Sequence, residues 1–428
     1  CVQAESEELV LTLLHRVQGL LLCIVNLVSP SGVLLDTSRS LAKEGIEDGD
    51  RLLAIVDKTD SPLQWHCRGF IFAALRTDGR LVVWGDQATS GTLTDVPELP
   101  EVESVQVTSR AIVAVTRDGG VVAWGDALTG GDSSSVQSQL VDVRQVCASS
   151  YAYSALRGDG TVVTWGDASS GGDSSGVQDQ LHDVLHLSAT CWAFAAVRRD
   201  GTVVTWGDPQ KGGDCRSVQD QLAEVKTVIA AGYSFAALRQ DGSVVTWGVA
   251  KRGGDSRLVQ HRLEKVVQIH ATIWAFAALR SDGLLVTWGD PAGGGDPHSP
   301  ATGLENVRQV CASEESFAAL CGDGAVASWG GFGNFRKADV QQISASSAAF
   351  AAVTQSGEVT TWGSRERGGV IGSSVAAELR DVQRICGSWG AFAALRADGT
   401  VVTWGSERSG GDSGHVRHLL TDVAEVWA

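Results

Sequence analysis

Short apolar runs separated by polar turns recur along most of the chain. A typical copy is "AFAAVRRDGTVVTWGD" (193–208), in which two apolar runs flank an Asp-Gly pair. Asp-Gly between two apolar runs is a strong β-hairpin signal, because glycine accepts the positive φ that a type I′ turn requires. A third run, such as 142–148 or 183–189, alternates apolar and polar residues and precedes each hairpin. Each copy therefore predicts three or four short strands.

The dipeptide Trp-Gly marks nine copies, spaced by 40, 41, 41, 41, 41, 41, 33 and 42 residues. Its tryptophans are Trp84, Trp124, Trp165, Trp206, Trp247, Trp288, Trp329, Trp362 and Trp404. Small antiparallel sheets that are apolar on both faces are buried by stacking on one another, so the pattern predicts an all-β chain, a β-propeller of short blades. No copy has the period of a helical solenoid, and a parallel β-helix is a weaker alternative because its repeats are shorter and lack hairpins.

Nine copies exceed the four to eight blades that propellers usually have. Either the ring is unusually large, or one propeller closes and the surplus copies begin another. The short eighth copy, "WGGFGNFRKADVQQISASSAAFAAV", lacks the Gly-Gly-Asp loop but keeps its strands. We expect it to form a blade nonetheless.

Residues 1–57 do not fit the repeat. The segment 6–19 predicts a helix with Ser6 as its N-cap, and strands are expected over 20–28, over 33–36 and at the end of 38–56. This order resembles the second half of a ubiquitin-like β-grasp, and "SLAKEGIEDGDRLLAIV" is similar to its closing segment. The diglycine tail of a modifier is absent, so we expect a small α+β docking module over 1–57, followed by the propeller over 58–428.

The repeat text "A-x-x-x-A-F-A-A-L-x-x-D-G-x-V-x-x-W-G-x-x-x-x-G" resembles the repeat of the regulator-of-chromosome-condensation family over roughly residues 60–428. The resemblance implies a propeller, usually of seven blades. Two departures stand out: alanine or serine replaces the common histidine before the inner strand, and Gly-Gly-Asp-Ser replaces Gly-Gln-Leu-Gly. The short, uniform copies are similar to the compact β-lactamase-inhibitor propeller of the same superfamily. They leave no room for the wedge through which the founding exchange factor is thought to act.

Composition narrows the choice of partners and location. The chain has 428 residues, 43% hydrophobic and 20% charged, which is enough apolar material for a large core. A net charge of −16 disfavours nucleic acid, and the longest apolar run, 20–28, is too short to cross a membrane. Nine cysteines without CxxC spacing indicate free thiols, so we expect an intracellular, cytoplasmic location. The start at Cys1 and the absence of methionine indicate a fragment or a processed form.

Several stretches look like sites but are better explained as scaffold. The Gly-Gly-Asp loops carry too few oxygens for calcium, and Asp and Ser beside Gly are ordinary turn formers, so we expect neither a metal nor a cofactor. Ser413 lies in "GGDSGH" (410–415), which resembles a protease nucleophile motif, but its sister loops show that it is a variant of the repeated turn. The Trp-Gly tryptophans are expected to form the core between blades.

A better functional signal is variation at one fixed position, two residues before "FAAL". It carries Phe70, Arg110, Tyr151, Trp192, Tyr233, Trp274, Glu315, Ala348 and Gly390, and Trp389 lies beside the last of these. Equivalent turns of a propeller open on one face, so Tyr151, Trp192, Tyr233, Trp274 and Trp389 predict a partner-binding surface. The compact inhibitor propeller is likewise thought to use loop aromatics on one face. Alternatively, each ring packs over its own blade and binds nothing.

The function expected from these features is a non-catalytic interaction scaffold that binds a protein partner, with no enzymatic activity in this chain. Two alternatives follow from the family resemblance. One is the substrate-recognition part of a larger HECT-type ubiquitin ligase, and the other is guanine-nucleotide exchange on a small GTPase.

Overall fold

The fold is described from a computed structural model of the chain. The structure describes residues 25–28, 53–56, 71–75, 81–85, 97, 99, 102–108, 110–298, 303–332, 335–414, 417 and 420. The chain divides into two compact units, Cys1–Gln64 and Trp65–Ala428. In the first unit, β1 (Val25–Val28) pairs antiparallel with β2 (Leu53–Val56), with Val25 opposite Val56. Both strands lie within segments predicted to be extended. The helix expected over 6–19 and the rest of the ubiquitin-like segment lie outside the described residues.

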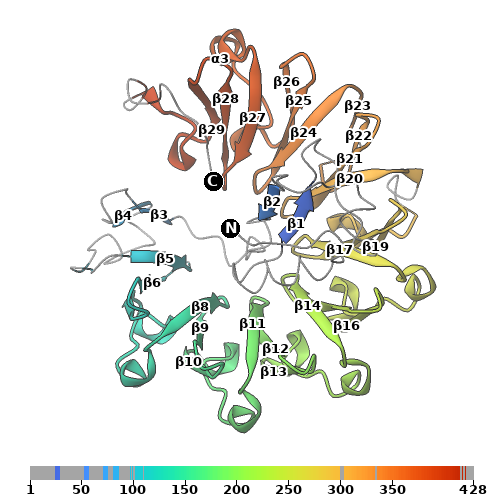
Figure 1. The fold of residues 1–428 in the computed structure, drawn as a ribbon. Coiled ribbons are helices and arrows are strands. Elements are labelled where there is room, and N and C mark those ends of the chain that lie inside the picture. The colour runs from blue at the N-terminus through green and yellow to red at the C-terminus, as the bar shows by residue number, and fades with distance from the viewer. Residues whose placement is uncertain are drawn as a thin grey trace, which may run out of the picture. The chain divides into compact units, whose positions relative to one another are not determined.

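Among the residues described for it, the second unit contains nine antiparallel sheets. Each Trp-Gly pair lies at the end of the third strand of its own sheet, or of the second strand where two strands are described. Figure 1 shows these sheets as successive blades in chain order. The strands are β3 (Ile71–Leu75) and β4 (Leu81–Gly85); β5 (Val102–Val107), β6 (Ala111–Thr116) and β7 (Val121–Gly125); β8 (Val143–Ala148), β9 (Ala152–Arg157) and β10 (Val162–Gly166); β11 (Val184–Ala189), β12 (Ala193–Arg198) and β13 (Val203–Gly207); β14 (Val225–Ala230), β15 (Ser234–Arg239) and β16 (Val244–Gly248); β17 (Val266–Ala271), β18 (Ala275–Arg280) and β19 (Leu285–Gly289); β20 (Val307–Ala312), β21 (Ser316–Cys321), β22 (Val326–Gly330) and β23 (Phe335–Lys337); β24 (Val340–Ala345), β25 (Ala349–Thr354) and β26 (Val359–Gly363); β27 (Val382–Gly387), β28 (Ala391–Arg396) and β29 (Val401–Gly405).

Helical segments are short and lie in the loops after the third strands. The 3-10 helices span Ala127–Thr129, Gln137–Gln139, Ala168–Ser170, Gln178–Gln180, Pro209–Lys211, Gln219–Gln221, Ala250–Arg252, Gln260–Arg262, Pro291–Gly293, Arg365–Arg367 and Glu407–Ser409, and the α-helix α3 spans Ser373–Glu378. The 3-10 helices that begin with a glutamine cover the free edge of the third strand, because this glutamine donates from Nε2 to a carbonyl of that strand. In one copy, Gln178 donates from Nε2 to the carbonyl of Val162 at 3.0 Å, and Ser174 orients that glutamine through its Oε1 at 2.7 Å.

The short copy covers this edge in a different way. Strand β23 pairs antiparallel with β22, with Val326 opposite Lys337, and the sheet that follows, β24 to β26, has the same order as the others. The prediction that the short copy still forms a blade is therefore confirmed.

The predicted type I′ turn at Asp-Gly is wrong. In the copy at 157–161, Gly160 N–H donates to the carbonyl of Arg157 and Arg157 N–H donates to the carbonyl of Thr161, both at 2.9 Å. Gly160 has φ +82°, whereas Asp159 is not among the residues with positive φ. A type I′ turn needs positive φ at both central residues, so this is the three-residue hairpin loop that ends in a left-handed glycine. Asp159 holds the loop by accepting from Thr161 N–H at 2.9 Å.

The core lies between neighbouring sheets. Phe194 stacks on Trp206 at a centroid distance of 5.4 Å, and both side chains are buried against Leu156 and Val162 of the preceding sheet. Trp206 also donates from Nε1 to the carbonyl of Gly171 in the preceding sheet's loop at 3.0 Å. Trp206 therefore lies in the core between blades, as predicted, and the other Trp-Gly tryptophans from Trp124 to Trp404 are buried as well.

Candidate functional site

The turns between first and second strands are joined from one sheet to the next by backbone hydrogen bonds, which we call the turn belt. Its six N–H···O bonds run from Ser150 to Cys191 (2.9 Å), Cys191 to Gly232 (3.0 Å), Gly232 to Ile273 (2.9 Å), Ile273 to Glu314 (2.9 Å), Glu314 to Ser347 (2.8 Å) and Ser347 to Trp389 (3.0 Å). Because each bond joins equivalent positions, the belt places the residues that follow it at regular intervals along one end of the sheets.

The five predicted binding residues all lie at this belt. Tyr151, Trp192, Tyr233 and Trp274 each follow a belt residue directly, and Trp389 is itself in the belt. All five side chains are half-buried. Together they are called the aromatic face.

Two rings of the aromatic face are in direct contact. The rings of Tyr151 and Trp192 meet edge to face, with centroids 5.4 Å apart. The five residues are therefore brought to one end of the sheets, and two of them touch.

A cation lies over each of the three tryptophans of the aromatic face. Lys211 Nζ is 3.7 Å from the centroid of the Trp192 ring and 2.8 Å from the carboxylate of Asp208. Burial opposes ionisation of Asp208, but hydrogen bonds from Lys211 and from Gln210 N–H outweigh it and lower the pKa of this carboxyl. One side of each ring is thus occupied and its orientation is held.

The second and third cations reach across from one sheet to the next. The Arg252 guanidinium is 4.4 Å from the ring centroid of Trp274 and 3.0 Å from the carboxylate of Asp290. The Arg367 guanidinium is 5.1 Å from the ring centroid of Trp389. Sequence reasoning missed these cations. The signal for them is a second variable position, the last residue of the 3-10 helix after the Trp-Gly strand.

The Gly-Gly-Asp loops hold themselves together, as predicted for turn formers. Asp214 accepts from Arg216 N–H at 2.9 Å, and its pKa is lowered to about 2, first by the hydrogen bond from the Arg216 side chain and next by this backbone bond. In the last loop, Asp412 accepts from Gly414 N–H at 2.8 Å, and the Ser413 hydroxyl is 2.9 Å from that of Thr403. Within the described part of the chain, no three His, Cys, Asp or Glu side chains are grouped as metal ligands would be.

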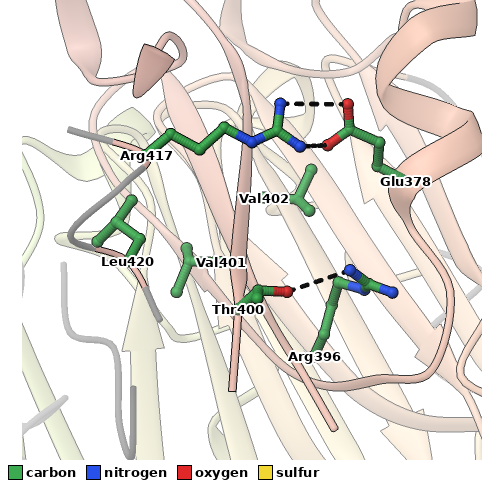
Figure 2. Close-up of a pocket in the computed structure, with 7 residues that line it drawn as sticks. All are labelled: Glu378, Arg396, Thr400, Val401, Val402, Arg417 and Leu420. Atoms are coloured by element: carbon green, nitrogen blue, oxygen red, sulfur yellow. Dashed lines mark hydrogen bonds and ion pairs between the residues drawn. The ribbon is translucent and has the colours of Figure 1, made fainter. Parts of the chain in front are cut away.

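A small pocket of about 150 Å³ lies beside α3 and β29 in the last sheet (Figure 2). Two arginines line it. Arg417 pairs with Glu378 at 2.6 Å, and Arg396 donates to the hydroxyl of Thr400 at 3.1 Å. Because both cationic side chains already have partners inside the pocket, the pocket is a weaker candidate site than the aromatic face. Among the described helices, none is long and apolar enough to cross a membrane.

The nine sheets define the class of protein: the chain is a repeat β-propeller, as the sequence predicts. No family model matches the chain, and no curated protein sequence is similar to it. Solved structures that are similar to it include Prp20p from Saccharomyces cerevisiae, with 18% identity over 62% of this chain and 72% of that one and a TM-score of 0.34. They also include the ectodomain of the receptor kinase CR4 from Physcomitrella patens, with 14% identity over 66% and 74% and a TM-score of 0.38.

Human WBSCR16 is a third such structure, with 15% identity over 70% of this chain and 88% of that one and a TM-score of 0.35. Prp20p is yeast RCC1, and its structural report concerns its binding to Gsp1p and histones. Yeast RCC1 is thus one of the solved structures to which the chain is similar.

Proposed function

We propose that this chain is a non-catalytic interaction module that binds a protein partner through its aromatic face. The observation that carries the proposal is a constant backbone frame that holds a variable set of side chains. The turn belt is made of backbone bonds and is the same from sheet to sheet, whereas the residue after it changes from tyrosine to tryptophan, glutamate or alanine.

The aromatic face has the physical character of a binding surface. Tryptophan, tyrosine and arginine are the residues that dominate the binding energy of protein interfaces. Rings that are already oriented lose little conformational entropy on binding, and the stacked Lys211 and Arg252 orient Trp192 and Trp274 before any partner arrives. The adjoining rings of Tyr151 and Trp192 offer a continuous apolar area.

The same contacts also stabilise the fold, and an experiment has to separate the two roles. Arg252 follows β16, whereas Trp274 and Asp290 belong to the next sheet, so this cluster joins two blades. Removal of Trp274 therefore weakens the contact between blades as well as any partner contact.

The proposal is tested by affinity capture with the full chain and with the double variant Trp192→Ala/Trp274→Ala. Loss of two interface aromatics is expected to weaken the partner by at least about 10-fold. Leu258→Ala is the matched control, because Leu258 is an apolar side chain that is 85% exposed and lies outside the aromatic face. Thermal melting of each variant reports the structural cost. Equal recovery of the partner by the double variant and the control would refute the proposal.

A further inference from the structure

We propose that Arg367, stacked on Trp389, is a binding site for a carboxylate group that an acidic segment of the protein partner supplies. This inference rests on the proposed function and specifies the chemistry of the partner. It comes from a comparison of the three places where a cation lies over a tryptophan of the aromatic face.

The two complete sites follow one rule. A carboxylate can reach the cation from the residue directly after Trp-Gly, either in the cation's own sheet or in the next sheet. Lys211 is paired by Asp208 of its own sheet, and the next sheet has Val249 at this position. For Arg252 the positions are reversed, because its own sheet has Val249 and the next sheet supplies Asp290. Each of these cations therefore receives one internal carboxylate.

Arg367 breaks this rule, because both positions are serine. Its own sheet has Ser364 after Trp-Gly, and the next sheet has Ser406. Among the residues that the structure describes, no carboxylate lies within ion-pair distance of Arg367.

The guanidinium is nonetheless held where the acid would meet it. Ser406 N–H donates to the carbonyl of Gly390 at 2.8 Å, and a Cβ added to Gly390 would lie 3.2 Å from Arg367 Nη1. Arg367 therefore lies against the turn that carries Trp389, beside the position where Asp290 lies in the complete site.

The chemistry of the vacant position favours a carboxylate. A guanidinium that stacks on an indole keeps its N–H donors at its edge, where they match the two oxygens of a carboxylate. The ring also holds the guanidinium in place, which lowers the entropy lost when the ligand binds. In both complete sites the group that pairs with the cation is an aspartate, although it comes from different sheets. Because the net charge of −16 repels acidic ligands at long range, binding there requires the local contacts.

The probe is a fluorescently labelled octaglutamate peptide, and its binding to the full chain is followed by anisotropy at about 0.1 M salt, where long-range charge effects are largely screened. The wild type should bind it saturably and should not bind octaglutamine. Ser406→Asp should restore the internal carboxylate and weaken peptide binding by about 10-fold or more, the effect of one charge-assisted hydrogen bond. Ser374→Asp is the matched control, because it adds the same charge to an exposed serine of α3, outside the aromatic face.

Arginine variants give a second comparison. Arg367→Gln should weaken peptide binding as strongly as Ser406→Asp does, whereas Arg257→Gln should leave it unchanged, because Arg257 lies outside the aromatic face and is already paired with Asp255 at 2.6 Å. The inference is overturned if the wild type shows no saturable binding of octaglutamate, or if Ser406→Asp binds as well as Ser374→Asp. If Trp192→Ala/Trp274→Ala loses the captured partner while Ser406→Asp retains both partner and peptide, the proposed function survives and this inference fails.

Discussion

Replacement of a Trp-Gly tryptophan by phenylalanine, compared between Trp206 and Trp362, measures the energetic effect of one hydrogen bond in the core. In six copies the Trp-Gly indole donates from Nε1 to a glycine carbonyl in the preceding sheet's loop. These bonds are Trp165 to Gly130, Trp206 to Gly171, Trp247 to Gly212 and Trp288 to Gly253, each 3.0 Å, and Trp329 to Gly294 and Trp404 to Gly368, each 3.1 Å.

Trp362 lacks this bond. Its side chain is only 8% exposed, and the buried Nε1 has no hydrogen-bond partner among the described residues. The cause is the shortened loop of the preceding copy, where Phe335 holds the position that Gly171 holds after Trp165. The Phe335 ring stacks on Trp362 with centroids 4.1 Å apart and rings 9° from parallel, so it covers the face of the indole but offers no acceptor.

The expected magnitude follows from a comparison of two sites. Trp206→Phe removes a bond and leaves the Gly171 carbonyl buried and unpaired, which costs about 1–3 kcal/mol on top of the lost packing. Trp362→Phe removes a donor whose burial already costs about 1–3 kcal/mol. Each tryptophan stacks on a buried phenylalanine at 5.4 Å, but Trp362 also stacks on Phe335 at 4.1 Å, and weakening of that second stack costs Trp362→Phe up to about 1 kcal/mol more. We therefore expect Trp362→Phe to be less destabilising than Trp206→Phe by at least about 1 kcal/mol.

Urea denaturation of both variants, followed by far-UV circular dichroism, measures this difference. The reference for each is wild-type chain unfolded under the same conditions, and equal slopes are needed before the free energies of unfolding are compared. If Trp362→Phe costs as much as Trp206→Phe or more, the missing acceptor has no energetic consequence and the reasoning is refuted.

Two further predictions concern the turn belt and the buried histidines. Gly232→Ala should destabilise the fold by about 1–3 kcal/mol, because a Cβ at this position would lie 2.7 Å from Ile273 Cγ2. Gly176→Ala is the control: a Cβ there would have no atom within 4 Å, so this variant should be neutral or slightly stabilising. Thermal melting compares the two, and equal effects would contradict the prediction. Burial lowers the pKa of His186 and of His270 from 6.5 to about 4, so the unfolded chain takes up protons first. The stability that the two neutral histidines contribute is therefore present above pH 6.5 and lost as the pH falls to about 4, by up to about 3 kcal/mol each. In the variant His186→Gln/His270→Ser, the melting temperature should depend less on pH over this window than it does in the wild type. An unchanged pH dependence would contradict this.

Much of the frame could be predicted from the sequence because each copy repeats the same signals. The run 183–189 predicts a strand, and the structure has β11 at Val184–Ala189. The turn type was missed because Asp-Gly is compatible with two loops. Which loop forms depends on Asp159, whose side chain holds Thr161 while its own φ stays negative.

The candidate site was only half predictable, for a physical reason. The aromatic residues can be recognised in the sequence, because they occur at or beside one position of the repeat that varies from copy to copy. The cations do not, because Arg252 and Trp274 belong to different copies and meet only when two sheets pack together. A pairing of this kind depends on the packing between blades, and periodicity within one copy carries no information about it.

The three cation sites differ in the residues that follow Trp-Gly, and the proposed carboxylate site rests on this difference. The belt and the sheets are held by backbone bonds and by buried rings, so a change at the residue after Trp-Gly leaves these bonds intact. Where an aspartate follows Trp-Gly in the cation's own sheet or in the next sheet, the cation forms an ion pair within the protein and contributes to stability. With serine at both, as at Ser364 and Ser406, the same cation is held by Trp389 but keeps its hydrogen-bonding capacity for another molecule. If Arg367 binds a carboxylate of a partner as proposed, a single change of residue type converts a structural contact into a binding contact, while the fold around it remains the same.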